Sequence, residues 1–173
     1  MAERGAAETP RDPKHGLVRG PFVLPRLARI AFVIGGVLPW LVPWIRAGGF
    51  PRLGVILDAI FVPLCHRLPA RTLLVGGVAM PLCSRCAGLF SGVAMGALIA
   101  RPAWSQKRWR RVLVATFALM LAEIAAQDLG LHPIWHASRL LTGALFGYAI
   151  GAATITALYA NARAEAASEA ALR

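Results

Sequence analysis

The chain has 173 residues, of which 57% are hydrophobic and only 16% are charged. A soluble domain has roughly 45–50% apolar and about 25% charged residues, so this composition supplies too little polar surface to cover a soluble protein. The net charge of +11 is compatible with nucleic-acid binding, but the basic residues flank apolar segments instead of gathering on one polar face. We therefore exclude nucleic acid as a partner and predict a single membrane domain whose solvent is the lipid bilayer.

The N-terminal part of the chain combines a polar leader with a long apolar segment. Residues 1–26 are basic and rich in Pro and Gly, which predicts a disordered cytoplasmic tail. Residues 27–45 form the first predicted span, and Trp40 and Trp44 mark its interfacial end. No small-x-small cleavage site follows this segment, which favours a retained anchor over a secretory signal peptide.

Residues 46–82 are predicted to face outward and to contain no complete span. The run 53–64 is apolar but short and carries Asp58, which favours an interfacial or re-entrant helix. Whether this run crosses the membrane stays open at this point. Two β-prone runs around Gly76 and Gly77 predict a small hairpin.

Three further spans are predicted, at about 83–100, 112–129 and 138–160. The C-terminal tail at 161–173 is Ala-rich and is expected to extend the last helix. The fold class is therefore all-α integral membrane, an approximately four-helix transmembrane bundle (membrane domain 27–160) with a short re-entrant or interfacial helix and a small hairpin before helix two. Basic residues cluster before the first span and in the 101–111 loop, which places both on the cytoplasmic side. Four spans return the C-terminus to that side.

Two predicted spans carry glycines at intervals of four residues, which places each set on one helix face. These are Gly88, Gly92 and Gly96 in the second span and Gly143, Gly147 and Gly151 in the fourth. In a bilayer, small residues let two helix backbones approach closely. We expect these stripes to pack helices within the bundle, with a homo-oligomer through the same stripes as the alternative.

All three cysteines, Cys65, Cys83 and Cys86, lie in one short stretch, and His66 follows the first. A C-x-x-C pair places two sulfurs within reach of one tetrahedral metal ion, and the same spacing is typical of a redox dithiol. We predict a zinc-like site with Cys65, His66, Cys83 and Cys86, with iron or copper less favoured. Adjacent residues rarely bind one ion together, so the fourth ligand stays open. The alternates are His132, His136 and Asp128.

The predicted topology strengthens this cluster because it brings all these residues to one membrane face. A cysteine at the start of the second span would be favoured as thiolate by the helix dipole. Three arginines would add positive field there, namely Arg67, Arg85 and Arg139. The plainer interpretations are an ordinary disulfide, which would leave one cysteine over, or buried inert thiols.

The segments CHRLPAR at 65–71, PLCSRCAG at 81–88 and SRLLTG at 138–143 resemble the signature of a family of small bacterial predicted membrane proteins. That family is catalogued as a domain of unknown function, and its pattern is CHQ-x-P-x-RS followed by PLC-x-RC-x-G-x-Y-x-G. The departures here are Arg67, Thr72 and Phe90 in place of Gln, Ser and Tyr. The resemblance covers roughly 60–151 and implies a bacterial inner-membrane location, but no activity.

Three classes of function follow from these features, and the sequence leaves open whether the protein is an enzyme. The first is a metal-binding membrane module, and the second is a membrane thiol-disulfide oxidoreductase that uses the C-x-x-C pair. The third is a small transporter or channel subunit. Glu123 lies within the third predicted span, where a carboxylate marks either a functional site or a hydrogen-bonded brace.

Overall fold

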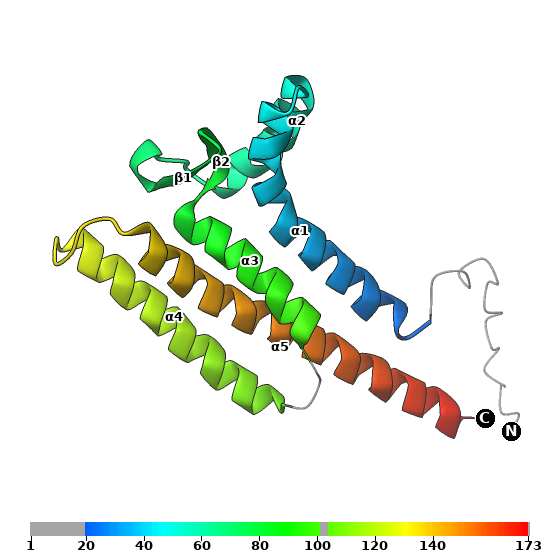
Figure 1. Ribbon diagram of the computed structural model, residues 1–173. Helices are drawn as coiled ribbons and strands as arrows, with labels where there is room; N and C mark the ends of the chain where they lie inside the picture. The colour runs from blue at the N-terminus through cyan, green and yellow to red at the C-terminus, as the bar shows by residue number, and fades with distance from the viewer. Residues whose placement is uncertain (1–19, 101–103, 173) are drawn as a thin grey trace, which may run out of the picture.

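The computed structural model describes residues 20–100 and 104–172, which fold into five α-helices and one β-hairpin (Figure 1). The helices are α1 (Val23–Ala47), α2 (Pro51–Phe61), α3 (Ser84–Ile99), α4 (Gln106–Asp128) and α5 (His136–Ala171). Two 3-10 turns, η2 (Val62–Leu64) and η3 (Pro69–Arg71), precede the strands β1 (Thr72–Val75) and β2 (Val78–Cys83). Residues 1–19 of the predicted tail lie outside the described residues, and α1 begins four residues before the predicted span.

The predicted hairpin is confirmed. Strands β1 and β2 pair antiparallel, and Val75 faces Val78 across a two-residue turn. The turn residues Gly76 and Gly77 have φ values of 57° and 78°. Positive φ at both central residues is what a type I′ turn requires, and its twist matches that of the paired strands. The Gly-Gly pair therefore fixes the position at which the chain folds back.

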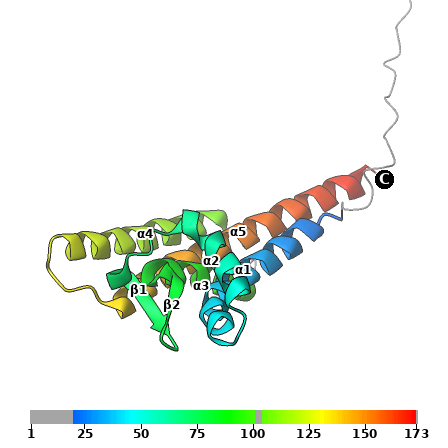
Figure 2. The same ribbon diagram turned by 90° about the horizontal axis from the view of Figure 1, so that it is seen from above.

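The helices lie side by side with α3 and α5 at the centre (Figure 1). Helix α1 packs on α3 and runs antiparallel to it, since Trp40 Nε1 donates to Ser91 Oγ at 2.8 Å while Arg29 contacts the Ala100 carbonyl oxygen. Helix α4 packs on α5 (Figure 2). The hairpin, the α4–α5 connection and the end of α1 consequently lie at one end of the bundle.

The two glycine stripes face each other across the contact between α3 and α5. This arrangement agrees with the prediction that they pack helices within the bundle. A Cβ added at Gly92 would lie 2.8 Å from the backbone nitrogen of Tyr148 and closer still to the Ala144 carbonyl oxygen. A Cβ at Gly147 would collide in the same way with the backbone of Leu89. Each stripe is thus covered by the other within the chain, and a homo-oligomer through them remains an untested prediction.

Two helices of the described residues, α1 and α5, are long and apolar enough to cross a membrane. Helix α3 is apolar but has only 16 residues. Helix α4 is not among the candidates, because it begins with four basic residues in two turns and ends with Glu123 and Asp128. The structure therefore shows a mostly helical fold with a hairpin and two helices that meet the length and hydropathy of a membrane span.

A small apolar cluster holds the hairpin against the helices. Its buried members come from α1, α2, β2 and α3, and they are Val42, Phe61, Met80, Leu82 and Ala87. Burying the Val, Phe, Met and Leu side chains of this cluster stabilises the contact by about 1.5–3 kcal/mol each relative to exposure in water. This cluster fixes the end of β2, and with it the first turn of α3, relative to the loop that follows α2.

Candidate metal centre

The structure brings the three cysteines together at the end of the bundle that carries the hairpin. Cys65 follows η2, Cys83 ends β2 and precedes α3, and Cys86 lies in the first turn of α3. The backbone amide of Cys83 donates to Cys65 Sγ at 3.3 Å. The three sulfurs lie within 4.8 Å of one another, and none forms a disulfide.

This spacing suits one thiolate-bound metal ion. Zinc–sulfur bonds of about 2.3 Å in a tetrahedron place the sulfurs roughly 3.8 Å apart. The observed upper limit of 4.8 Å is therefore close to a ligating arrangement, and small side-chain rotations would complete it. Of the described residues, these three cysteines form the one such group of potential ligands.

The surroundings favour the thiolate form of Cys83, which lies just outside α3. The pKa of Cys83 is lowered well below its usual value, and the hydrogen bond from the Cys86 thiol is the largest cause. Burial opposes this shift, and the backbone of Cys86, the Cys65 thiol and the charge of Arg139 assist it. The N-terminus of α3 adds the positive end of the helix dipole. A thiolate is both the nucleophilic and the metal-binding form of cysteine.

The predicted fourth ligands are placed less closely than the cysteines. His66 lines the same cavity as the three cysteines, but it is exposed and does not belong to the group within 4.8 Å. His132 and His136 lie on the α4–α5 connection and at the first residue of α5. Asp128 lies 3.9 Å from Nη2 of Arg71. Metal binding by any of these side chains stays a prediction.

The cysteines line an open cavity of about 250 Å³. His66 and four arginines contribute to its wall, the arginines being Arg67, Arg71, Arg85 and Arg139. Three of these arginines are expected from the sequence to add positive field. Arg71 also lines this cavity, which the sequence does not predict. Its position in the segment CHRLPAR, six residues after Cys65, could have indicated that it lies near the cysteines.

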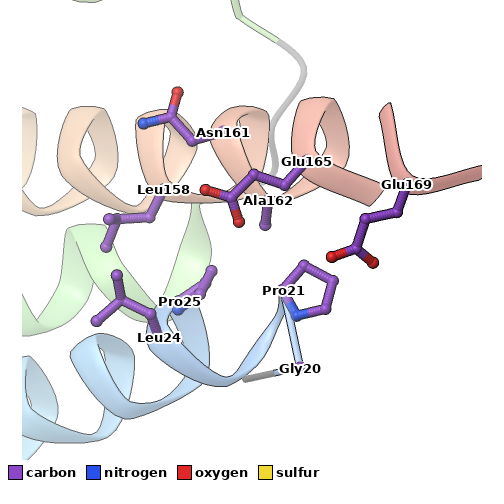
Figure 3. A pocket seen from close by; sticks show the side chains of 9 residues that line it. All are labelled: Gly20, Pro21, Leu24, Pro25, Leu158, Asn161, Ala162, Glu165 and Glu169. Atoms are coloured by element: carbon purple, nitrogen blue, oxygen red, sulfur yellow. The ribbon is translucent and has the colours of Figure 1, made fainter. Parts of the chain in front are cut away.

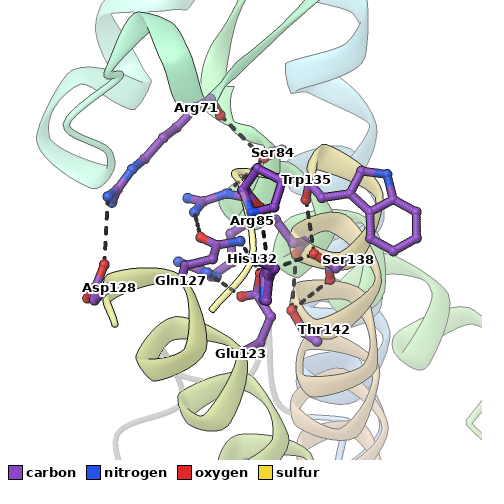
Figure 4. Close-up of polar contacts among 12 residues, drawn as sticks. Arg71, Ser84, Arg85, Glu123, Gln127, Asp128, His132, Trp135, Ser138 and Thr142 are labelled. Carbon is purple, nitrogen blue, oxygen red and sulfur yellow. Dashed lines mark hydrogen bonds and ion pairs between the residues drawn. The ribbon is translucent and has the colours of Figure 1, made fainter. Parts of the chain in front are cut away.

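Arg139 is the most deeply buried charged side chain at the site, with 2% of its surface exposed. Its Nε donates to Ser84 Oγ at 3.2 Å, and its Nη1 donates to Gln127 Oε1 at 2.6 Å. Ser84 Oγ in turn donates to the backbone carbonyl oxygen of Arg71 at 3.3 Å (Figure 4). Arg139 therefore links α5 to the first residue of α3 and to α4.

Glu123 of α4 is held by partners from three helices (Figure 4). One carboxylate oxygen pairs with Nη2 of Arg85, and the other accepts hydrogen bonds from Gln127 and from Ser138 Oγ, the latter at 3.2 Å. The side chains of Arg85 and Glu123 are only 14% and 8% exposed. These contacts support the interpretation of Glu123 as a brace that connects α3, α4 and α5.

A second cavity, of about 460 Å³, lies at the opposite end of the bundle, between the start of α1 and the end of α5 (Figure 3). Its polar side chains are Asn161, Glu165 and Glu169, and none of its lining residues is a cysteine or histidine. It therefore offers no soft ligand, and the cysteine-lined cavity is the candidate functional site.

The sequence profile of a family described as "Predicted membrane protein (DUF2085)" matches residues 65–153, just over half of the chain. The chain belongs to this family. The match begins at Cys65 and includes both other cysteines, Glu123 and Arg139, so family membership and the candidate site cover the same part of the fold. The predicted membrane class is confirmed by this match, whereas the finer signature stays a resemblance.

A curated relative, "Uncharacterized protein MJ1492" of the archaeon Methanocaldococcus jannaschii, is 26% identical over 105 residues. The alignment covers 57% of this chain and 65% of that protein. Because this relative is archaeal, similarity does not place the chain in bacteria. No solved structure matches the chain.

Proposed function

We propose that this chain is a multi-pass membrane protein that binds one metal ion through Cys65, Cys83 and Cys86 at its outer face. The observation that carries the proposal is the convergence of three sulfurs within 4.8 Å of one another from two separate segments. A sulfur-rich set of this kind favours zinc, with iron or copper(I) behind it. The surroundings of Cys83 lower the pKa of its thiol and so favour the thiolate, which is the form that binds a metal ion.

The fourth coordination position determines what the metal does. We infer that His66 is the first candidate, because it lines the cavity with the cysteines, and that His132, His136 and Asp128 are alternates. A closed four-ligand set would be structural and would join the loop after α2 to α3. Three protein ligands with an open position would permit catalysis, so the question of enzymatic activity depends on this position.

Four spans, formed by α1, α3, α4 and α5, complete the proposal. Helix α4 is about 34 Å long in all. Its part after Arg111 is about 26 Å long and spans most of a hydrocarbon core of about 30 Å, while the basic first turns lie at the headgroups. Helix α3 is shorter, about 24 Å, but it is enclosed by α1 and α5. We place both termini in the cytoplasm of a bacterial-type inner membrane, with α2 at the outer interface, where its apolar side chains are exposed.

Elemental analysis with thiol titration tests the metal function. The full chain, purified in mild detergent under reducing conditions, should carry one equivalent of zinc, and chelation should make all three thiols titratable. Cys83→Ser should lose the stoichiometric metal, since two sulfurs remain. Thr72→Ser, across the hairpin from Cys83, is the matched control and should keep it. A metal-free wild-type chain that zinc fails to reconstitute would contradict the proposal.

A membrane thiol-disulfide oxidoreductase is the second candidate, favoured by the lowered pKa of Cys83 next to Cys86. In that function the two thiols would join as a disulfide and release two electrons and two protons to a membrane quinone. Cys65 would exchange with one of them. The same thiol titration discriminates the two functions, because a metal-free protein with one reducible disulfide supports the oxidoreductase. A transporter or channel subunit is the third candidate, and the paired state of Glu123 gives it no added support.

A further inference from the structure

Four guanidinium groups converge on the cavity beside the cysteines. Arg67 and Arg71 come from the segment before β1, Arg85 from α3 and Arg139 from α5. Of the described residues, no Asp or Glu lines this cavity. Gathering like charges around one concave space costs free energy unless an anion offsets their repulsion. The wall therefore carries more positive than negative charge even when the Cys83 thiolate is counted, which favours an added anion.

Two of these arginines have close carboxylate partners, and both partners lie outside the cavity wall. Arg67 pairs with Asp58 at 2.7 Å, and Arg85 pairs with Glu123. These ion pairs fix the positions of the Arg67 and Arg85 guanidinium groups without placing a carboxylate in the cavity wall. Arg85 Nε is nevertheless buried without a hydrogen-bond partner among the described residues, which leaves one fixed donor unsatisfied.

The charges of the other two arginines, Arg71 and Arg139, are less neutralised by carboxylates. The contact of Arg71 with Asp128 is 3.9 Å long, and the two side chains are 38% and 64% exposed, so solvent screens it strongly. Arg139 is almost fully buried, and no carboxylate of the described residues lies within ion-pair distance of it. Its hydrogen-bond partners, Ser84 and Gln127, are neutral. Arg139 also stabilises the Cys83 thiolate in the same wall, but one thiolate does not balance the four guanidinium groups that line the cavity.

We propose that this cavity binds a phosphate-class oxyanion, with Arg71, Arg85 and Arg139 as its ligands. Guanidinium groups bind such anions through paired N–H donors, which gives both strength and orientation. Inorganic phosphate and the headgroup phosphate of an anionic lipid offer the same chemistry at this membrane face. The inference goes beyond the metal function and does not require it, because Glu123 holds Arg85 and Gln127 and Ser84 hold Arg139 without any metal.

The test titrates inorganic phosphate into the metal-free, reduced full chain in phosphatidylcholine vesicles, with calorimetry in an oxyanion-free buffer. One saturable site is expected. Arg71→Gln should weaken binding about tenfold, the loss of roughly one charge-assisted hydrogen bond at a partly exposed position. Arg71→Lys, which keeps the charge and loses the fork, should fall between. Arg52→Gln is the control, since Arg52 is exposed on α2 and does not line the cavity.

A repeat in vesicles that contain phosphatidylglycerol separates the two sources of phosphate. Competition by this lipid assigns the site to a headgroup, and unchanged affinity assigns it to the free anion; both outcomes keep the oxyanion site. Absence of saturable phosphate binding would overturn the oxyanion site. Equal weakening by Arg52→Gln and Arg71→Gln would overturn it as well. In either case the arginines would serve only to stabilise the thiolates. Cys83→Ser should retain phosphate binding while losing metal, so the two proposals fail separately.

Discussion

Replacing Gly92 of α3 by alanine should destabilise the bundle, because a Cβ there has no room. It would lie 2.8 Å from the Tyr148 backbone nitrogen, whereas carbon atoms pack at about 3.5–4.0 Å from their neighbours. The colliding atoms belong to the backbone of α5, so the two helices must separate. Overpacking of this kind costs about 1–3 kcal/mol.

Gly35 of α1 is the matched control. A Cβ at Gly35 meets no atom within 4 Å, so alanine there adds only helix propensity, worth about 0.5–1 kcal/mol. Both variants gain this helix propensity, so they should differ by the overpacking alone, about 1–3 kcal/mol in the free energy of unfolding. The next residue, Gly36, provides a second comparison, because its Cβ would collide with Ala94 and the Phe90 carbonyl oxygen of α3.

Equilibrium unfolding in mixed detergent micelles, followed by circular dichroism, measures this difference. Gly92→Ala and Gly36→Ala should unfold at lower denaturing-detergent fractions than the wild type, and Gly35→Ala at an equal or higher fraction. If Gly92→Ala matches Gly35→Ala within error, the α3–α5 contact is not as close as described. The packing argument for the glycine stripes would then be wrong.

Two further predictions concern the brace and the sidedness of the membrane domain. Glu123→Gln should destabilise the protein by about 3–5 kcal/mol in the same unfolding assay, because it leaves Arg85 buried without its carboxylate; Arg85→Gln combined with it should cost less than the sum of the single changes, and additive effects would contradict the pairing. In a cysteine-free background, Leu131→Cys should react with an impermeant thiol reagent from outside and Trp104→Cys only from inside; labelling of both from one side would refute the four-span topology.

The sequence predicts several local features of this fold correctly because their causes are local. Gly76 and Gly77 specify the hairpin turn, since their missing Cβ atoms permit positive φ. The four-residue spacing of the glycines specifies a helix face that admits close packing. The nearness of Cys83 and Cys86 to each other follows from one turn of helix. Each of these conclusions needs only a few neighbouring residues.

The exact ends of the helices were harder to predict than their existence. Helix α4 starts at Gln106, six residues before the predicted span, because the basic residues of that segment continue the helix beyond any apolar stretch. Helix α5 continues to Ala171, so most of the Ala-rich tail forms the helical extension expected from the sequence. Hydropathy marks what a bilayer can hold, whereas a helix ends where its backbone hydrogen bonding ends, so the two boundaries differ.

Sequence patterns alone are enough to predict the membrane class, the hairpin, the glycine-lined helix faces and the cysteine cluster as a candidate site. The residues that these features contact cannot be predicted from such patterns and are seen in the packed helices. In the folded protein Cys65 contacts the residue before α3, Glu123 forms an ion pair with Arg85, and Arg139 is buried beside the thiols. Periodicity and motif spacing report the face that a residue occupies, but the group opposite that face comes from a distant segment and depends on how whole helices pack.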